Sequence, residues 1–215
     1  MRAFEGLHAI GDSHCRLFCD LVNKDNVHWL GPITMHRVGR DGVEGLKSSR
    51  EWLDAFGTLS PRSWVPTMSR GDIVAWVFGE IDVRCHLVKA VAARGEGALH
   101  DLIQPYLKTI AAFSAETGTL PVIVSLAPAR NSHNRRFPCV GSMDERKGMT
   151  RKVNSLLRTS APLYGARYCD LWGRVTDTQG EVLPGMLADE IHLGGKAGEA
   201  LALEITQTLR GADAS

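Results

Sequence analysis

The chain has 215 residues, and 44% of them are hydrophobic, enough for one folded domain with a full core. Its 25 basic and 24 acidic residues give a net charge of +1, without a basic stripe interleaved with aromatic side chains, so nucleic acid is excluded as an expected partner. No stretch approaches the roughly 18 apolar residues of a membrane span, and the first residues lack the apolar core of a signal peptide. We therefore predict a cytoplasmic protein without a membrane span.

Short apolar runs alternate along the chain with longer segments of helical period, a pattern typical of strands and helices in turn. In chain order, we predict strand 6–11, helix 15–23, strand 27–30, helix 43–57, loop 58–71, strand 72–78, helix 98–118, strand 120–128, helix 146–159, strand 166–172 and helix 196–211. Five strands separated by helices indicate a parallel, doubly wound sheet between two layers of helices, an α/β/α sandwich. One such domain accounts for residues 1–211 and leaves a short polar tail at 212–215.

The five cysteines are odd in number, and no two of them form a C-x-x-C pair. Neither a disulfide framework nor a zinc knuckle is therefore indicated. We predict reduced thiols, and we expect Cys15 to pack inward as a small apolar group.

The carboxyl ends of parallel strands lie at one edge of a sheet, where ligands bind in open α/β folds. Four predicted connections start at this edge, and each carries polar or glycine residues. They are GDSH at 11–14, GPITM at 31–35, GEIDVRCH at 79–86 and APARN at 127–131. We interpret all four as loops that converge on one site.

Ser13 is a candidate nucleophile, although a serine between a strand and a helix more often caps the helix. The segment DEIHLG places Asp189 and His192 three residues apart, so one turn can aim the carboxylate at the imidazole and the imidazole at Ser13. Asp25 and His28 have the same spacing, but His28 falls in a predicted strand. The later pair falls in an irregular segment before the last helix, which favours it as the partner of Ser13.

The segments GDSH, FGEID and DEIHLG together resemble the SGNH, or GDSL-type, hydrolase superfamily, and the resemblance covers nearly the whole chain in element order. It implies a five-stranded, flavodoxin-like sheet and the cleavage or transfer of acyl groups, often acetyl groups on sugars. Carried over by position, it makes Ser13 the nucleophile, His192 the general base and then acid, and Asp189 the group that orients the imidazole. The implied mechanism uses a covalent serine intermediate and no metal or organic cofactor.

The resemblance also implies an oxyanion hole built from the amides of Ser13 and Gly31, with Gly79 as a further member. The family's third motif is Gly-x-Asn-Asp, and here it reads GEID, so Ile81 stands where the asparagine would be. Isoleucine cannot donate a hydrogen bond, and loss of one oxyanion donor typically slows the reaction by about 100- to 1,000-fold. The GEID variant resembles a subgroup encoded among surface-polysaccharide genes, which implies a glycan or its precursor as substrate.

Ionisable residues alternate with apolar residues or a thiol after Gly79. They are Glu80, Asp82, Arg84 and His86. We expect Arg84 or His86 to supply the missing oxyanion donor, and Glu80 or Asp82 to hold that donor or to bind sugar hydroxyls. The alternative is an ion pair between Glu80 and Arg84 that only braces the loop.

Three further residues at the same edge are candidates for substrate contact, and for each the alternative is ordinary solvation. They are His14, Arg130 and Asn131. Trp64, in the predicted loop 58–71, is the best candidate for a platform under a sugar ring.

Two other classes of protein remain open. Asp12 and His14, followed by Asp82 and His86, resemble the start of a two-metal phosphoesterase site, although the remaining ligand motifs of that family are missing. A glycan-binding pseudoenzyme that keeps the fold and lacks turnover is favoured by Ile81.

The sequence thus predicts a serine esterase that acts on an acylated, and we expect acetylated, carbohydrate or polysaccharide precursor. An O-acyltransferase would use the same residues and differ only in whether water or a sugar hydroxyl takes the acyl group, so both activities stay open. The expected partner is a small-molecule or glycan ester.

Overall fold

The protein is described by a computed structural model that covers residues 4–48, 68–132 and 135–210. Five parallel strands form one sheet in the order β2-β1-β3-β4-β5. The strands are β1 (Leu7–Gly11), β2 (Val27–Trp29), β3 (Ile73–Val77), β4 (Leu120–Val124) and β5 (Arg167–Cys169). The α-helices are α1 (Met35–Ser48), α2 (Glu80–Asp82), α3 (Val88–Arg94), α4 (Gly97–Thr117), α5 (Met143–Ser160), α6 (Leu171–Val175) and α7 (Lys196–Arg210). The described residues also contain three 3₁₀ helices, η1 (Ser13–Asp20), η2 (Lys24–Asn26) and η5 (Ala161–Tyr164), and one π-helical segment, η4 (Val83–Leu87).

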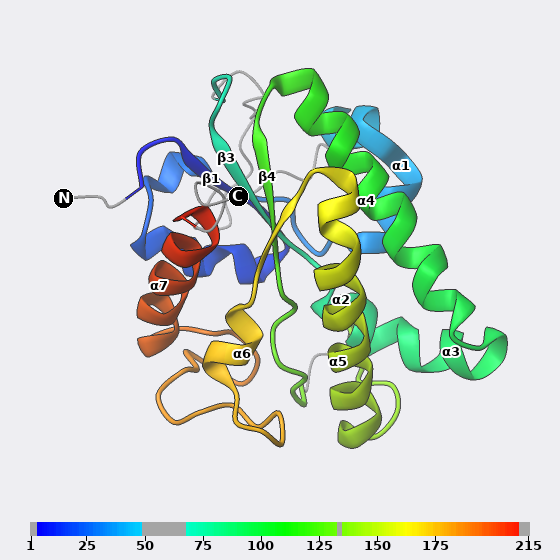
Figure 1. The fold of residues 1–215 in the computed structure, drawn as a ribbon. Coiled ribbons are helices and arrows are strands. Elements are labelled where there is room, and N and C mark those ends of the chain that lie inside the picture. Colours follow the sequence, from blue (N-terminus) through cyan, green and yellow to red (C-terminus); the bar gives the residue numbers. More distant parts are fainter. Residues whose placement is uncertain (1–3, 49–67, 133–134, 211–215) are drawn as a thin grey trace.

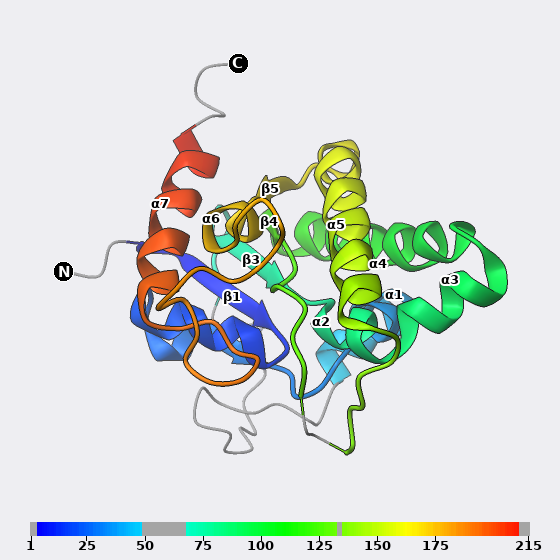
Figure 2. The ribbon, with the colours of Figure 1, turned by 90° about the horizontal axis from the view of Figure 1, so that it is seen from below.

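Helices cover both faces of the sheet, which confirms the predicted three-layer α/β/α sandwich (Figures 1 and 2). Alternate residues of a strand point to opposite faces. Ile10 and Trp76 pack in the core beneath α1, α4 and α5, whereas Ala9 and Ala75 pack in the core beneath η1 and α7. Within the described ranges, no helix is both long and apolar enough to span a membrane.

The first long helix begins at Met35, earlier than the predicted helix 43–57. The Asp82 carboxylate accepts hydrogen bonds from the backbone amides of Met35 (2.7 Å) and His36 (3.3 Å), and so satisfies donors that a helix start leaves free. Asp82 lies 47 residues after Met35 in the sequence, so the sequence near Met35 does not indicate this cap. The predicted end of this helix and Trp64 lie outside the described residues.

The predicted loop 79–86 is helical, because α2, η4 and α3 follow one another without a break. Gly79 starts the run in the left-handed region (φ 113°). A Cβ at this position would lie 2.7 Å from Sδ of Met35 and 2.8 Å from Cγ of Leu126, so the packing requires glycine. The loop interpretation was wrong because it relied on the local run of ionisable residues, whereas Glu80, Asp82 and Arg84 are buried within the helical run.

Elsewhere the structure follows the prediction closely. The predicted helix 15–23 is realised as the 3₁₀ helix η1, and Cys15 is buried beneath it, as expected. All five cysteines are free. The segment 176–195 is irregular apart from two isolated bridges, Thr176 with Val182 and Leu187 with Leu193.

Candidate active site

Ser13 is the first residue of η1 and lies just beyond the carboxyl end of β1. The strand passes close to β3 here, since a Cβ on Gly11 would overlap the carbonyl oxygen of Val77 and lie 2.9 Å from its Cβ. Asp12 then caps the helix, because its Oδ1 accepts the backbone amide of His14 at 2.9 Å. The amide of Ser13 opens the helix and has no acceptor within it, so it is free to bind an anion.

The structure brings together the three residues that the sequence singled out. Nε2 of His192 lies 2.8 Å from Oγ of Ser13, and Nδ1 of His192 lies 2.7 Å from Oδ2 of Asp189. The other carboxylate oxygen of Asp189 accepts the backbone amides of Ile191 (2.9 Å) and His192 (2.8 Å). Asp189 therefore organises the short turn that carries the imidazole to the serine.

The electrostatics of this row assign a role to each nitrogen of the His192 ring. Burial would raise the pKa of Asp189, but the amide and imidazole hydrogen bonds outweigh it and lower that pKa to about 2. Because the ionised carboxylate can only accept, Nδ1 of His192 carries the proton that it donates to Asp189. Nε2 is then the basic nitrogen that accepts the hydrogen bond from the Ser13 hydroxyl.

A cavity of about 400 Å³ opens beside Ser13, between η1 and the segment that carries His192. Its wall includes the proposed nucleophile and base together with polar and charged groups of η1 and η2. Among the lining residues are Ser13, His192, Arg16, Cys19, Asp20 and Lys24. The cavity has room for a small acyl group and part of an attached sugar.

Gly31 and Gly79, the two glycines predicted to join Ser13 in the oxyanion hole, follow β2 and β3, and both have positive φ (74° and 113°). The side chain of Ile81 is only 5% exposed and offers no donor. The predicted oxyanion hole of the Ser13, Gly31 and Gly79 backbone amides therefore lacks the side-chain donor that asparagine supplies in the related motif.

Replacing Ile81 by asparagine is expected to raise kcat for a small acetyl ester by about tenfold or more, within the roughly 3 to 4 kcal/mol that one oxyanion donor contributes. The same change should lower the stability by about 1 to 3 kcal/mol, because a polar amide enters a buried position. Steady-state kinetics and urea denaturation measure the two effects. Ile81→Val is the apolar control, and an unchanged kcat in Ile81→Asn would show that a side-chain amide at this position does not reach the oxyanion.

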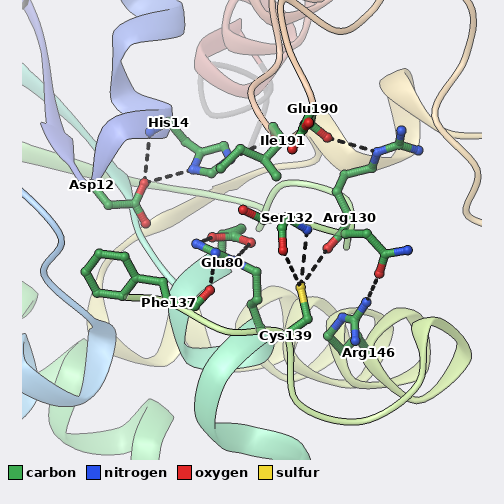
Figure 3. Close-up of polar contacts among 12 residues, drawn as sticks. Asp12, His14, Glu80, Arg130, Ser132, Phe137, Cys139, Arg146, Glu190 and Ile191 are labelled. Carbon is green, nitrogen blue, oxygen red and sulfur yellow. Dashed lines mark hydrogen bonds and ion pairs between the residues drawn. The ribbon is translucent and has the colours of Figure 1, made fainter. Parts of the chain in front are cut away.

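Glu80 and Arg84 form a buried ion pair, with side chains only 6% and 5% exposed. Nε of Arg84 donates to one Glu80 oxygen (2.6 Å) and Nη2 to the other (3.0 Å), while Nη1 donates to the carbonyl of Phe137 (2.7 Å; Figure 3). Three of the five N–H groups of Arg84 are thus directed at Glu80 and Phe137, so these hydrogen bonds do not include a contact with Ser13. The alternative reading, an ion pair that braces this segment, describes the structure.

Asp82 and His86 are also directed elsewhere. The Asp82 carboxylate is occupied by the first amides of α1, and burial raises its pKa to about 7 although those amides oppose the shift. His86 lines a separate cavity of about 340 Å³ together with Thr34 and His36, and neither Ser13 nor His192 borders that cavity. The sequence-based roles of Asp82 and His86 in binding substrate at Ser13 are therefore not supported by their positions.

The carboxylates and imidazoles proposed for a two-metal site are engaged in other contacts. Asp12 and His14 pair with each other, and Asp82 caps α1. Across residues 4–48, 68–132 and 135–210, no three His, Cys, Asp or Glu side chains are grouped so that they could hold a metal ion.

Arg130 and Asn131 lie in the loop after β4, and Figure 3 shows Arg130 beside Glu190. Nε of Arg130 donates to the carbonyl of Glu190 at 3.3 Å, which ties this loop to the segment that carries His192. Oδ1 of Asn131 accepts from Nη2 of Arg146, a buried residue of α5 that the sequence reasoning missed. Arg146 stands in a run of charged residues, DERK, which is typical of a solvated helix face and gave no signal of burial.

His14 is 8% exposed, so the solvated first-turn histidine considered above is ruled out. Its Nδ1 lies 3.1 Å from Oδ1 of Asp12 and its Nε2 lies 3.2 Å from the carbonyl oxygen of Ile191. The ring also forms part of the wall of the cavity beside Ser13, which is consistent with the predicted substrate contact.

No protein-family model and no curated protein matches the chain. Its structural neighbours are SGNH/GDSL hydrolases over nearly its whole length, and the chain therefore has the fold of that class. A GDSL-like lipase from Bacteroides thetaiotaomicron is 12% identical and superposes with a TM-score of 0.57 over 96% of this chain and 88% of the lipase. A catalytic mutant of an acetylxylan esterase from Geobacillus stearothermophilus is also 12% identical, with a TM-score of 0.53 over 97% of this chain and 96% of the esterase.

Proposed function

We propose that the chain is a serine esterase that removes acyl groups, acetyl in the first place, from a carbohydrate or polysaccharide precursor. The observation that carries the proposal is the hydrogen-bonded row of Ser13, His192 and Asp189 at the mouth of a cavity of about 400 Å³. An esterase fold, with an acetylxylan esterase among the structural neighbours, supports the choice of substrate class.

In the first half of the reaction, Oγ of Ser13 attacks the acyl carbon while Nε2 of His192 takes the hydroxyl proton. The oxyanion of the tetrahedral intermediate faces the amides of Ser13 and Gly31. When the intermediate collapses, the bond to the sugar oxygen breaks, and that oxygen takes the proton from His192. The products of this half are a free sugar hydroxyl and an acylated Ser13.

In the second half, a water molecule attacks the acyl-serine and gives a proton to His192. The second tetrahedral intermediate expels Oγ of Ser13, which takes that proton back, and the carboxylic acid leaves. Asp189 stays ionised throughout, because its pKa lies near 2, and stabilises the imidazolium that forms twice in each cycle. A sugar hydroxyl in place of water would make the same residues an acyltransferase.

Incubation with a fluorophosphonate, followed by peptide mass spectrometry, tests the proposal. We expect modification of Ser13, because the reagent mimics the tetrahedral intermediate and requires an activated serine hydroxyl. His192→Ala should abolish the labelling, whereas Ser132→Ala, which removes a serine of the loop after β4, should not. Labelling at Cys15, or no labelling of a folded preparation, would refute the proposed nucleophile.

The substrate class is tested separately by release of acetate from an acetylated xylo-oligosaccharide and from p-nitrophenyl acetate. Faster turnover of the glycan ester, measured as kcat/KM, is the expected result. Acetate appearing on an added sugar acceptor, and not in solution, would assign transfer in place of hydrolysis.

A further inference from the structure

His14 makes two hydrogen bonds that together define its protonation state. Both of its ring nitrogens face oxygen acceptors, Oδ1 of Asp12 at 3.1 Å and the carbonyl oxygen of Ile191 at 3.2 Å (Figure 3). A neutral imidazole has one N–H, so it would turn a lone pair toward one of these oxygens inside a buried site. Only the imidazolium satisfies both contacts, because both of its nitrogens donate.

The charges around His14 support the same assignment. Asp12, in the turn after β1, is buried, and its Oδ2 has no hydrogen-bond partner among the described residues. The ring of His14, which contacts Oδ1, is the group that can compensate the negative charge of this carboxylate. The negative charge of Glu80, in α2, also raises the pKa of His14, although Glu80 itself forms an ion pair with Arg84. From the segment 176–195, the ring of His192 lies 5.0 Å away between centroids. With His14 protonated, the carboxylates of Asp12 and Glu80 are balanced by the two cations His14 and Arg84.

The second hydrogen bond of His14 reaches the residue directly before His192. Ile191 belongs to the turn organised by Asp189, whose Oδ1 holds the amides of both Ile191 and His192. A contact that fixes the carbonyl of Ile191 therefore fixes the whole turn. Apart from the bond between Ser13 and His192, this is the hydrogen bond that joins the turn to η1 in the described structure.

We propose that His14 is a positioning residue: as a buried imidazolium bound to Asp12, it holds the carbonyl of Ile191 and so keeps His192 within hydrogen-bond reach of Ser13. The expected effect on reaction rate rests on the proposed esterase function. The two hydrogen bonds of His14, to Asp12 and to the carbonyl of Ile191, are called the clamp below and are present in the free protein. Burial would lower the pKa of His14, yet Asp12 and then Glu80 outweigh burial and raise it to about 9. The clamp should thus hold at neutral pH and weaken as the pH rises through about 9.

Two substitutions separate the two hydrogen bonds of His14. The amide nitrogen of glutamine can stand near the position of Nε2, so His14→Gln keeps a donor for the Ile191 carbonyl and does not titrate. Asparagine is shorter and places its amide near Nδ1, so His14→Asn keeps a partner for Asp12 but cannot reach Ile191. Both variants lose the positive charge, which makes each the control for the other.

The activity-independent readout is hydrogen–deuterium exchange of the Ile191 and His192 amides. We expect exchange in His14→Asn at least about tenfold faster than in His14→Gln, and wild-type exchange that accelerates above pH 9 beyond the intrinsic base dependence, an acceleration absent from His14→Gln. Equal exchange in the two variants overturns the clamp. If either variant fails to fold, nitrogen-15 NMR of the wild-type His14 ring decides: a neutral ring at pH 7 overturns the proposal, and a doubly protonated ring supports it.

The rate of Ser13 phosphonylation connects the clamp to catalysis. At pH 7, His14→Gln is expected within about threefold of wild type, and His14→Asn at least about tenfold slower, because small displacements of a catalytic group are costly. Equal labelling rates in the two folded variants would refute the positioning role. No labelling of wild-type Ser13, with the exchange pattern intact, would instead refute the esterase function and leave the clamp standing.

Discussion

Replacing Ser13 by alanine is expected to lower kcat for p-nitrophenyl acetate by on the order of a million-fold, the loss that removal of a nucleophile causes in serine hydrolases. The hydroxyl is the atom that becomes acylated, and His192 and Asp189 have nothing to activate without it. The melting temperature should change little, because the hydroxyl lies at the wall of the cavity and its hydrogen bond is to His192. Stopped assays at high enzyme concentration and a thermal melt measure the two quantities.

Cys15 provides a matched control two residues further along η1. It is fully buried, and burial raises the pKa of its thiol well above the usual range, so it is a poor nucleophile. Cys15→Ala should therefore retain most of the activity. The double variant Ser13→Ala with His192→Ala should be no slower than Ser13→Ala alone, since residues that act as a unit are not additive. Retention of a hundredth or more of the activity in Ser13→Ala would assign the chemistry to another group.

The fold could be predicted because its determinants are local. The strand at 73–77 is an unbroken apolar run with helical segments on either side. Such a run is typical of a parallel strand that is buried on both faces of the sheet. The pair of Asp189 and His192 could be predicted for a similar reason, because the two residues are three apart and their contact lies within one turn. Ser13 is 179 residues from His192, and the family resemblance, not a local pattern, indicated that contact.

The features that could not be predicted depend on partners far away in the sequence. The start of α1 is fixed by Asp82, and the burial of Arg146 depends on the loop after β4. In each case a charged residue, which composition alone places in solvent, is buried against a partner that no local pattern identifies. His14 is the clearest example, since its second partner is the carbonyl of Ile191, 177 residues away.

Glu80 and Arg84 show what such burial means for stability. Transfer of two charges out of water is costly, and their mutual attraction offsets this cost only while both partners are present. The pair also holds the carbonyl of Phe137, so it joins the helical run after β3 to the loop between β4 and α5 (Figure 3). The segment that carries the altered third motif is therefore stabilised by contacts within the protein.

Arg84→Ala is expected to destabilise the protein by about 3 to 5 kcal/mol, the usual result of removing one partner from a buried ion pair. The substitution leaves the Glu80 carboxylate buried without its cation and the carbonyl of Phe137 without its donor. Urea denaturation at neutral pH measures the change. Arg94→Ala is the matched control, because its pair with Asp101 is exposed on both sides and should contribute no more than about 1 kcal/mol.

A second variant separates the loss of attraction from the cost of a stranded charge. If the buried carboxylate is the source of the instability, then Glu80→Gln combined with Arg84→Met should recover most of the stability that Arg84→Ala loses, because neither a charge nor a large void remains. A double variant as unstable as Arg84→Ala would show that the hydrogen bond to Phe137 matters more than the ion pair. A loss below about 1 kcal/mol in Arg84→Ala itself would contradict the buried pair, since water would then have to reach Glu80 in the native protein.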